Sequence, residues 1–140
     1  MNAFPEIDYQ KQLIVSGLDD FSPNAALSQV LGGQFGSNSE LWRQAVIEFL
    51  CINVRANLLE CTNRKEISGD AGAILLRELL NFGDKKNNID SEIIWNVLYF
   101  SATQNLECML NKFQLNSWDS LNQGVNFNFI KALREIYCEV

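Results

Sequence analysis

Histidine is absent from the 140 residues of this chain. Without an imidazole, the protein cannot form a Ser-His-Asp triad, a Cys-His pair or a histidine-ligated zinc site. The longest apolar stretches, 46–52 and 93–100, are each interrupted by a polar residue, and both are far shorter than the roughly 20 residues of a membrane span. Residues 1–6 contain no basic or apolar region typical of a secretory signal. These absences exclude the histidine-dependent catalytic centres and predict a cytoplasmic protein.

Cysteine is scattered along the chain rather than paired. The four cysteines, Cys51, Cys61, Cys108 and Cys138, show no C-x-x-C spacing, whereas structural zinc sites use ligands only a few residues apart. We therefore expect four free thiols, buried in the core of a protein from a reducing compartment. The glycine-rich segment 32–36 lacks the Gly-Lys-Ser/Thr ending of a phosphate-binding loop. The sequence accordingly predicts neither a metal ion nor a cofactor.

Acidic residues outnumber basic ones by seventeen to eleven, which gives a net charge of −6. Nucleic acids and anionic membranes are bound through cationic surfaces, so neither is expected as the main partner. The excess is strongest in residues 1–40, where a single lysine accompanies five acidic residues. An acidic surface attracts basic proteins and accelerates their association. A basic protein is therefore the favoured partner, although solubility alone would also explain the charge.

Start and stop signals of helices recur along the chain. Its length suits one domain, and many of its sixteen asparagines stand where a helix should begin or end. The expected helices span 6–16, 23–31, 39–62, 68–82, 90–113, 117–123 and 126–138. Period-two alternation is not sustained anywhere, so no strand is expected. The prediction is an all-α protein, a single-domain bundle of five to seven helices over residues 1–140, with a flexible elbow at 32–37.

Two long helices in this prediction carry polar residues of interest. The helix 39–62 is mostly apolar and is expected to be central, and Asn53, Asn57 and Glu60 give its second half an additional polar side. The helix 90–113 carries one continuous polar stripe, formed by Glu92, Asn96, Tyr99, Thr103, Glu107 and Asn111. Tyrosine and asparagine are common in protein contact surfaces. An ordinary solvated face would have a similar composition, so both interpretations remain open.

The candidate partner-binding residues come from the acidic amino-terminal region and from the polar stripe. They are Asp8, Asp19, Asp20, Glu92, Asn96, Tyr99 and Glu107. Adjacent carboxylates in a loop, such as Asp19 and Asp20, are screened from one another by water and rarely act as an acid–base pair. We therefore expect these residues to bind a partner rather than to catalyse a reaction, and we expect no enzyme activity.

In size, acidity and asparagine content, the chain resembles the small helical immunity proteins of bacterial toxin–immunity pairs, including those of contact-dependent growth inhibition. The resemblance implies a cytoplasmic protein that binds a toxin, commonly a basic nuclease, and covers its active site or substrate groove. Inhibition would then be stoichiometric and would involve no chemistry by this chain. Two alternatives remain open: a helical adaptor such as a secretion chaperone or regulatory subunit, and an enzyme that uses carboxylates alone.

Overall fold

The computed structural model describes residues 4–140. Its main elements are six α-helices: α1 (Glu6–Leu18), α2 (Ser39–Arg55), α3 (Gly69–Phe82), α4 (Ser91–Val97), α5 (Gln104–Lys112) and α6 (Phe127–Cys138). Short 3₁₀ helices lie in the connections: η1 (Pro23–Ala25), η2 (Val30–Phe35) and η3 (Trp118–Asn122). The predicted all-α class is confirmed, and the helices share one hydrophobic core. None of the helices within residues 4–140 is long and apolar enough to cross a membrane.

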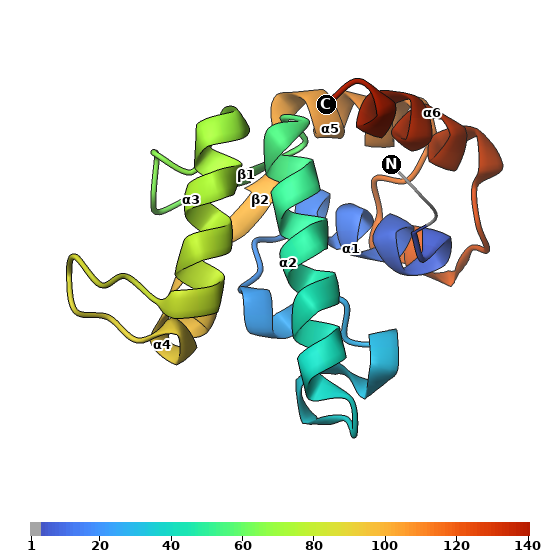
Figure 1. Cartoon of the computed structure of the whole chain (residues 1–140). Coiled ribbons are helices and arrows are strands. Elements are labelled where there is room, and N and C mark those ends of the chain that lie inside the picture. Colours follow the sequence, from blue (N-terminus) through green and yellow to red (C-terminus); the bar gives the residue numbers. More distant parts are fainter. Residues whose placement is uncertain (1–3) are drawn as a thin grey trace.

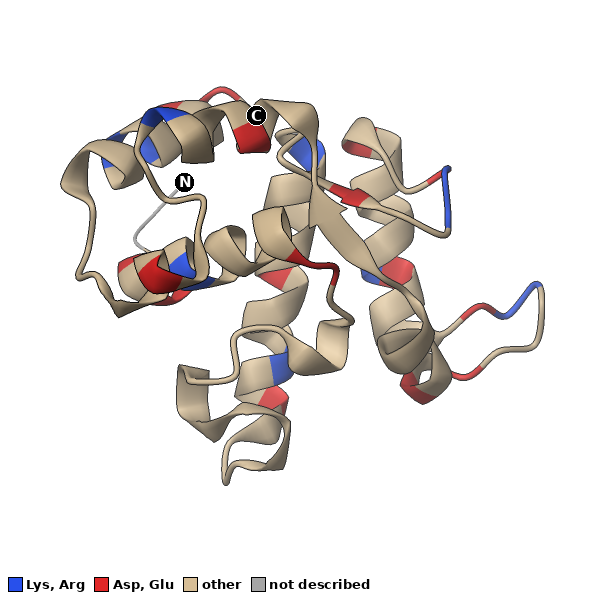
Figure 2. Ribbon diagram, turned by 180° about the vertical axis from the view of Figure 1, so that it is seen from behind, with Lys and Arg blue, Asp and Glu red and all other residues tan. Residues whose placement is uncertain are grey.

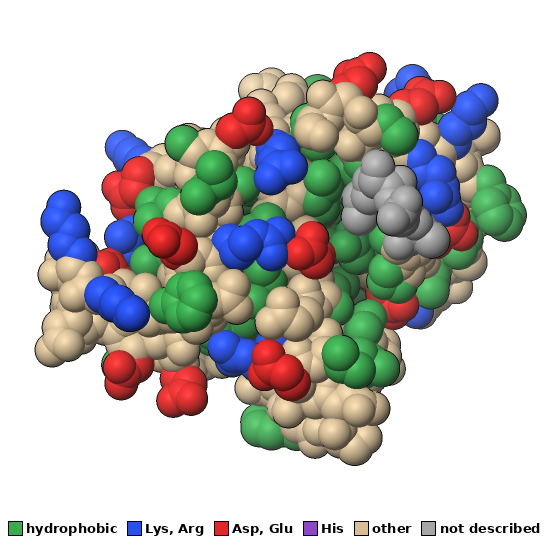
Figure 3. Space-filling view, viewed as in Figure 1, with side chains coloured by type: hydrophobic (Ala, Val, Ile, Leu, Met, Phe, Trp, Pro, Cys, Tyr) green, Lys and Arg blue, Asp and Glu red, His purple; other side chains and the backbone are tan. Residues whose placement is uncertain are grey.

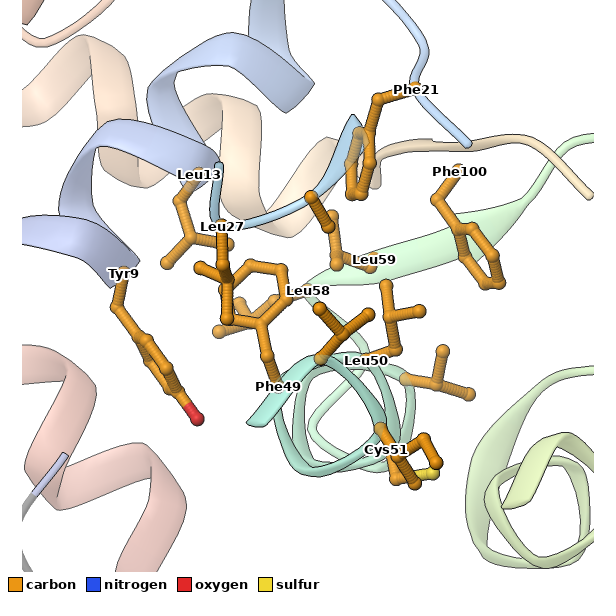
Figure 4. Close-up of a cluster of buried hydrophobic side chains, with 14 of the residues drawn as sticks. Tyr9, Leu13, Phe21, Leu27, Phe49, Leu50, Cys51, Leu58, Leu59 and Phe100 are labelled. Carbon is orange, nitrogen blue, oxygen red and sulfur yellow. The ribbon is translucent and has the colours of Figure 1, made fainter. Parts of the chain in front are cut away.

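α2 and α3 run side by side through the middle of the molecule (Figure 1). α2 buries an apolar side that includes Val46, Ile47 and Leu50, and α1 packs Tyr9 edge-to-face on Phe49, with ring centroids 4.7 Å apart. Figure 4 shows side chains from α1, α2 and the segment after α2 meeting in this cluster. Burial of apolar surface is the main driving force of folding. α2 is therefore central, as the sequence predicts.

The expectation of no strand is wrong, because a short antiparallel pair lies beside α2. β1 (Leu59–Cys61) pairs with β2 (Phe100–Ala102), and Cys61 lies opposite Phe100. On the other edge of β2, the backbones of Phe21 and Phe100 exchange hydrogen bonds of 3.0 and 2.9 Å. We call β1, β2 and the segment around Phe21 the ribbon. Its inner side buries Phe21, Cys61 and Phe100 in the core.

The predicted helix 39–62 is too long, because α2 ends with a left-handed residue. Asn57 has a φ of 57°, its N–H binds the Val54 carbonyl at 3.1 Å, and the Leu58 N–H binds the Asn53 carbonyl at 2.9 Å. This pair of bonds is the Schellman motif, which ends a helix and satisfies its last carbonyls. Asparagine tolerates the left-handed conformation better than most residues. The apolar pattern therefore continues past Asn57 as a strand.

The predicted helix 90–113 is also wrong, because the structure divides it into α4, β2 and α5. Its middle alternates between buried and exposed side chains, which is the two-residue period of a strand. The buried members are Leu98, Phe100 and Ala102. The Thr103 hydroxyl then caps a new helix by accepting the N–H of Leu106 at 3.3 Å. The polar stripe predicted for one helix is therefore divided between α4, the residue before β2, and α5 with its cap.

The connection between α1 and α2 contains η1 and η2 in place of the predicted α-helix 23–31. Leu27 and Leu31 have positive φ values, 49° and 54°, which are unfavourable for leucine. Leu27 is held in this conformation by the buried side chain of Gln12, whose Oε1 accepts the Leu27 N–H at 2.9 Å. The predicted flexibility of 32–37 remains a prediction, and the backbone before α2 is irregular there.

The prediction of four buried thiols is half wrong. All four cysteines are free, but Cys108 on α5 and Cys138 on α6 are exposed, while Cys51 and Cys61 are buried. Burial raises the pKa of the Cys51 thiol to about 11 and also raises the pKa of the Cys61 thiol above its usual value. The thiolate is the reactive form of cysteine. Cys51 and Cys61 are therefore protected from reagents in two ways: they are buried, and their raised pKa values keep the thiols protonated.

A thiol reagent such as DTNB should therefore distinguish two pairs at neutral pH. We expect two thiols to react rapidly in the native protein and two more only after unfolding in urea. Cys108→Ser and Cys138→Ser should each remove one rapid equivalent. Rapid reaction of three or more thiols in the native protein would contradict the burial of Cys51 and Cys61.

A buried hydrogen-bond network attaches α6 to α2. The Tyr137 hydroxyl donates to Asn53 Oδ1 at 2.7 Å, and Asn53 Nδ2 donates to the Phe49 carbonyl at 2.8 Å. Asn53 is thus fully buried, which corrects the expectation that it lies on a polar outer side of the helix. Buried polar groups are costly unless they are paired, so this network fixes how α6 packs on α2.

Tyr137→Phe should lower the free energy of unfolding by about 1–3 kcal/mol, because Asn53 Oδ1 would stay buried without a donor. Urea denaturation at pH 7 measures the loss. Tyr99→Phe removes an exposed hydroxyl and should change the value by less than about 0.5 kcal/mol. Equal losses in the two variants would contradict the proposed network.

The same variant tests the pH dependence of stability. Burial raises the pKa of Tyr137 well above its usual value, so the unfolded chain loses this proton first, near pH 10. The free energy of unfolding is therefore unaffected by this group below pH 10 and falls as the pH rises above it. In Tyr137→Phe, the free energy of unfolding should fall less steeply above pH 10 than it does in the wild type.

Candidate partner-binding face

Two carboxylates stand at the carboxyl end of α1. Asp19 caps the helix, with its N–H bound to the Val15 carbonyl, and the Asp20 N–H binds Asp19 Oδ1 at 2.9 Å. Both residues are exposed, and the last turn of α1 contains no basic residue. The carboxyl end of a helix carries a partial negative charge, which disfavours nearby anions. The charges of Asp19 and Asp20 therefore do not stabilise α1.

The ribbon brings Asp20 next to residues from two distant segments. Because Phe21 pairs with Phe100 in antiparallel orientation, the register sets Asp20 opposite Ser101, and Ser101 in turn pairs with Glu60. Side chains alternate along a strand, so these three residues point away from the buried Phe21 and Phe100. Asp20, Ser101 and Glu60 thus form one row across the outer side of the ribbon.

Tyr99 lies directly before β2 and faces the same outer side, with 42% of its surface exposed. Its N–H binds Asn63 Oδ1 at 3.2 Å, and Asn63 Nδ2 donates to the Val97 carbonyl at 2.7 Å. The Tyr99 carbonyl accepts the Thr62 N–H at 2.8 Å. The backbone is therefore fixed on both sides of the tyrosine, so its side chain is presented by a preorganised segment.

α5 adds Glu107 near the end of α1. Gly17 lies so close to α5 that a Cβ at this position would be 2.6 Å from Leu110 Cδ1. Gly17, Leu110 and Glu107 line a single hollow of about 230 Å³. Asp19 follows Gly17 by two residues, so the carboxyl end of α1 adjoins Glu107.

We call Asp19, Asp20, Glu60, Tyr99 and Glu107 the acidic face. Within residues 4–140, its four carboxylates have no lysine or arginine at salt-bridge distance, and all five arginines of the chain bind carboxylates elsewhere. Figure 2 views the molecule from this side, with red segments on the loop after α1 and on the neighbouring strand. Four uncompensated carboxylates and an exposed tyrosine on neighbouring segments are suited to contact with a basic protein.

Glu92 and Asn96 lie on α4 rather than on the helix of Glu107. The Asn96 side chain accepts a hydrogen bond from Asn24 Nδ2 at 2.6 Å and donates one to the Glu92 carbonyl at 3.0 Å. Both residues line a hollow of about 290 Å³ between α4 and the start of α2. The structure therefore places this part of the predicted stripe between α4, η1 and the start of α2, where Asn96 holds η1 against α4.

An exposed apolar strip on α4 leads toward the acidic face. Ile93 and Val97 are one helical turn apart, and 50% and 44% of their surfaces are exposed. Val97 is joined to Tyr99 through the hydrogen bonds of Asn63. Apolar and aromatic side chains surrounded by polar residues are the usual composition of a protein interface.

Asp8 lies apart from the other predicted residues, near the amino end of α1. Eleven residues separate it from Asp19, which corresponds to about 16 Å along a helix. A carboxylate in the first turns of a helix is favoured by the helix dipole, so Asp8 stabilises α1. The structure does not bring Asp8 to the acidic face.

Glu60 belongs to the acidic face but is absent from the predicted candidates. On the predicted helix 39–62 it is one more polar residue, whereas on β1 it faces outward between buried neighbours. The signal that would have revealed it is Asn57, whose left-handed backbone ends α2. The position of Glu60 thus depends on a turn that apolar periodicity does not detect.

Comparison with family models, with curated proteins and with solved structures finds no match to this chain. In the part of the chain that the structure describes, no three acidic or cysteine residues are grouped so that they could hold a metal ion.

Proposed function

We propose that this chain is a cytoplasmic immunity protein, which binds a basic bacterial toxin domain and covers its active site or substrate groove, as in contact-dependent growth inhibition. The observation that carries the proposal is the pair Asp19 and Asp20, which stands against the helix dipole with no cation beside it. Residues that violate a rule of stability are expected at functional sites. A cationic partner would compensate these charges.

Binding would occur in two stages. The carboxylates attract a cationic surface over about 10 Å at 0.1 M ionic strength, which accelerates association. Tyr99 and the apolar strip of α4 then pack against the partner and slow dissociation. Because a nuclease binds a polyanion, its substrate groove is cationic. An acidic protein that covers this groove competes directly with nucleic acid and needs no chemistry of its own.

The test begins by identifying the partner. The tagged chain is cross-linked in cells of its native organism, and the bound proteins are identified by mass spectrometry. We expect a basic protein with nuclease or other toxic activity. The purified chain should abolish that activity at a molar ratio of one to one, and its co-expression should restore the growth of cells that produce the toxin.

Each part of the proposal has an outcome that would contradict it. An acidic partner, or an association rate that does not depend on salt, would contradict the electrostatic part. A partner whose activity is unchanged by binding would contradict the immunity role and favour a helical adaptor. Turnover of a small molecule by the purified chain would contradict the whole proposal.

A further inference from the structure

The side chain of Asn63 connects α4 to the ribbon. Its Nδ2 donates to the Val97 carbonyl at 2.7 Å, and its Oδ1 accepts the Tyr99 N–H at 3.2 Å. Val97 is the last residue of α4, and Tyr99 directly precedes β2. Asn63 therefore binds the backbone on both sides of the joint at which the helix becomes a strand.

The chemistry of this joint favours an asparagine at position 63. The last carbonyls of a helix have no acceptor role within it, and the chain leaves α4 abruptly, since Leu98 is extended with a φ of −78° and a ψ of 141°. The Val97 carbonyl needs a donor, whereas the Tyr99 N–H needs an acceptor. A primary amide supplies both, an ionised aspartate supplies acceptors only, and alanine supplies neither.

The residues before Asn63 hold the other side of Tyr99. The N–H and the hydroxyl of Thr62 both donate to the Tyr99 carbonyl, at 2.8 and 3.3 Å. The Cys61 thiol donates to Asn63 Oδ1 at 3.4 Å, which helps to orient the amide. Three consecutive residues thus fix the backbone of Tyr99, and Asn63 alone of the three also holds it against the end of α4.

The side chains held by this joint are those that would pack against a partner. Tyr99 and Val97 expose 42% and 44% of their surfaces. Ordering of side chains and loops on binding lowers affinity, so a segment that is already fixed binds more tightly. The polar atoms of Asn63 are bound to groups of its own chain. Its contribution to binding would therefore pass through Tyr99.

We propose that Asn63 is a positioning residue of the partner-binding site, which holds Tyr99 beside the apolar strip of α4 in the arrangement that the partner contacts. The inference rests on the proposed function, in which the partner packs on Tyr99. Attraction between charges acts before the surfaces touch and does not require a fixed tyrosine. Loss of the Asn63 amide should therefore change the rate of dissociation and leave the rate of association nearly unchanged.

Hydrogen–deuterium exchange, followed by NMR, tests the positioning in the free protein. In Asn63→Ala, the Tyr99 N–H should exchange about fivefold to tenfold faster than in the wild type, because it has lost its acceptor. The Phe100 N–H binds the Phe21 carbonyl at 2.9 Å, so its exchange should be unchanged and verifies that the ribbon is intact. Equal exchange of the Tyr99 N–H in the two proteins would overturn the proposal.

Surface plasmon resonance tests the effect on binding, with the basic partner captured by cross-linking as the probe. Asn63→Ala should dissociate about threefold to tenfold faster, with an association rate within about twofold of the wild type. Asn87→Ala is the matched control and should bind as the wild type does. It removes a hydrogen bond of 2.8 Å to Asp84 in the loop after α3, which Figure 3 shows at the left edge of the molecule.

A double variant distinguishes positioning from direct contact. If Asn63 acts through Tyr99, Asn63→Ala should accelerate dissociation of Tyr99→Ala by less than about twofold. An undiminished acceleration in that variant would mean that Asn63 touches the partner, which overturns the proposal. Unchanged dissociation of Asn63→Ala, beside faster dissociation of Tyr99→Ala, overturns this inference alone. Unchanged dissociation in both single variants contradicts the proposed binding site together with this inference.

Discussion

A variant with Asp19→Asn and Asp20→Asn is expected to bind its partner about tenfold to a hundredfold more slowly at low salt, because electrostatic steering raises association rates by such factors. The same variant should be more stable than the wild type. Removing two anions from the carboxyl end of α1 relieves an unfavourable interaction worth about 0.3–1 kcal/mol. Asparagine keeps the Oδ1 that accepts the N–H of residue 20. Stopped-flow mixing measures association, and thermal denaturation measures stability.

Slower association together with higher stability would show that the two carboxylates serve binding rather than folding. Asp90→Asn/Glu135→Gln lowers the net negative charge by the same amount at exposed positions outside the acidic face. It should slow association by less than about threefold, since only general attraction is reduced. If both variants slow association equally, Asp19 and Asp20 lie outside the interface. If the first variant is less stable than the wild type, the argument from the helix dipole is wrong.

The helices were predictable because their ends carry local signals. Asn126 lies before a helix with periodic apolar residues, and in the structure its Oδ1 accepts the Phe129 N–H at 3.0 Å. At the end of α3, Gly83 has a φ of 79°, and a Cβ there would lie 2.4 Å from the Ile89 carbonyl oxygen. Glycine is the usual residue after a helix for this reason. Such signals act within a few residues and can be read from the sequence alone.

The ribbon was not predictable because its partners are distant in sequence. Phe21, Cys61 and Phe100 come from three separate segments, and each strand is only three residues long. In the segment before Ala102, the exposed Tyr99 is itself aromatic, so the alternation of polarity is hidden. Tertiary pairing overrides local propensity in such short segments.

The prediction of the candidate site contains the same error, because it assumes a single helix over 90–113. The sequence predicts Tyr99 and Glu107 on one helical stripe, but the structure places them before β2 and on α5. They nevertheless adjoin Asp19 and Asp20, because the ribbon and the contact of Gly17 with α5 bring these segments together. Whether these residues bind a partner remains a prediction. The net charge was available from the sequence, whereas the grouping of the charges required the fold.

Phe100, the first residue of β2, and Tyr99, the residue before it, are expected to differ strongly in how much their truncation to alanine lowers stability. Phe100 is fully buried and packs near Phe21, with ring centroids 6.1 Å apart. Phe100→Ala should therefore lower the free energy of unfolding by about 3–5 kcal/mol, a large part of the roughly 5–15 kcal/mol of a typical domain. Tyr99→Ala truncates an outward side chain and should cost less than about 1 kcal/mol of stability. Urea denaturation of both variants measures the difference.

The effects of the two variants on binding should be in the reverse order, with Tyr99→Ala having the larger effect. Tyr99→Ala removes an exposed aromatic contact and should accelerate dissociation from the partner, with a loss of about 1–3 kcal/mol in binding free energy. Phe100→Ala, studied under conditions where it remains folded, should change dissociation far less, because its side chain faces the core. If Tyr99→Ala is as destabilising as Phe100→Ala, this segment is not a strand with alternating faces. If Tyr99→Ala leaves dissociation unchanged, Tyr99 is not part of the interface, and the partner contacts another surface of the chain.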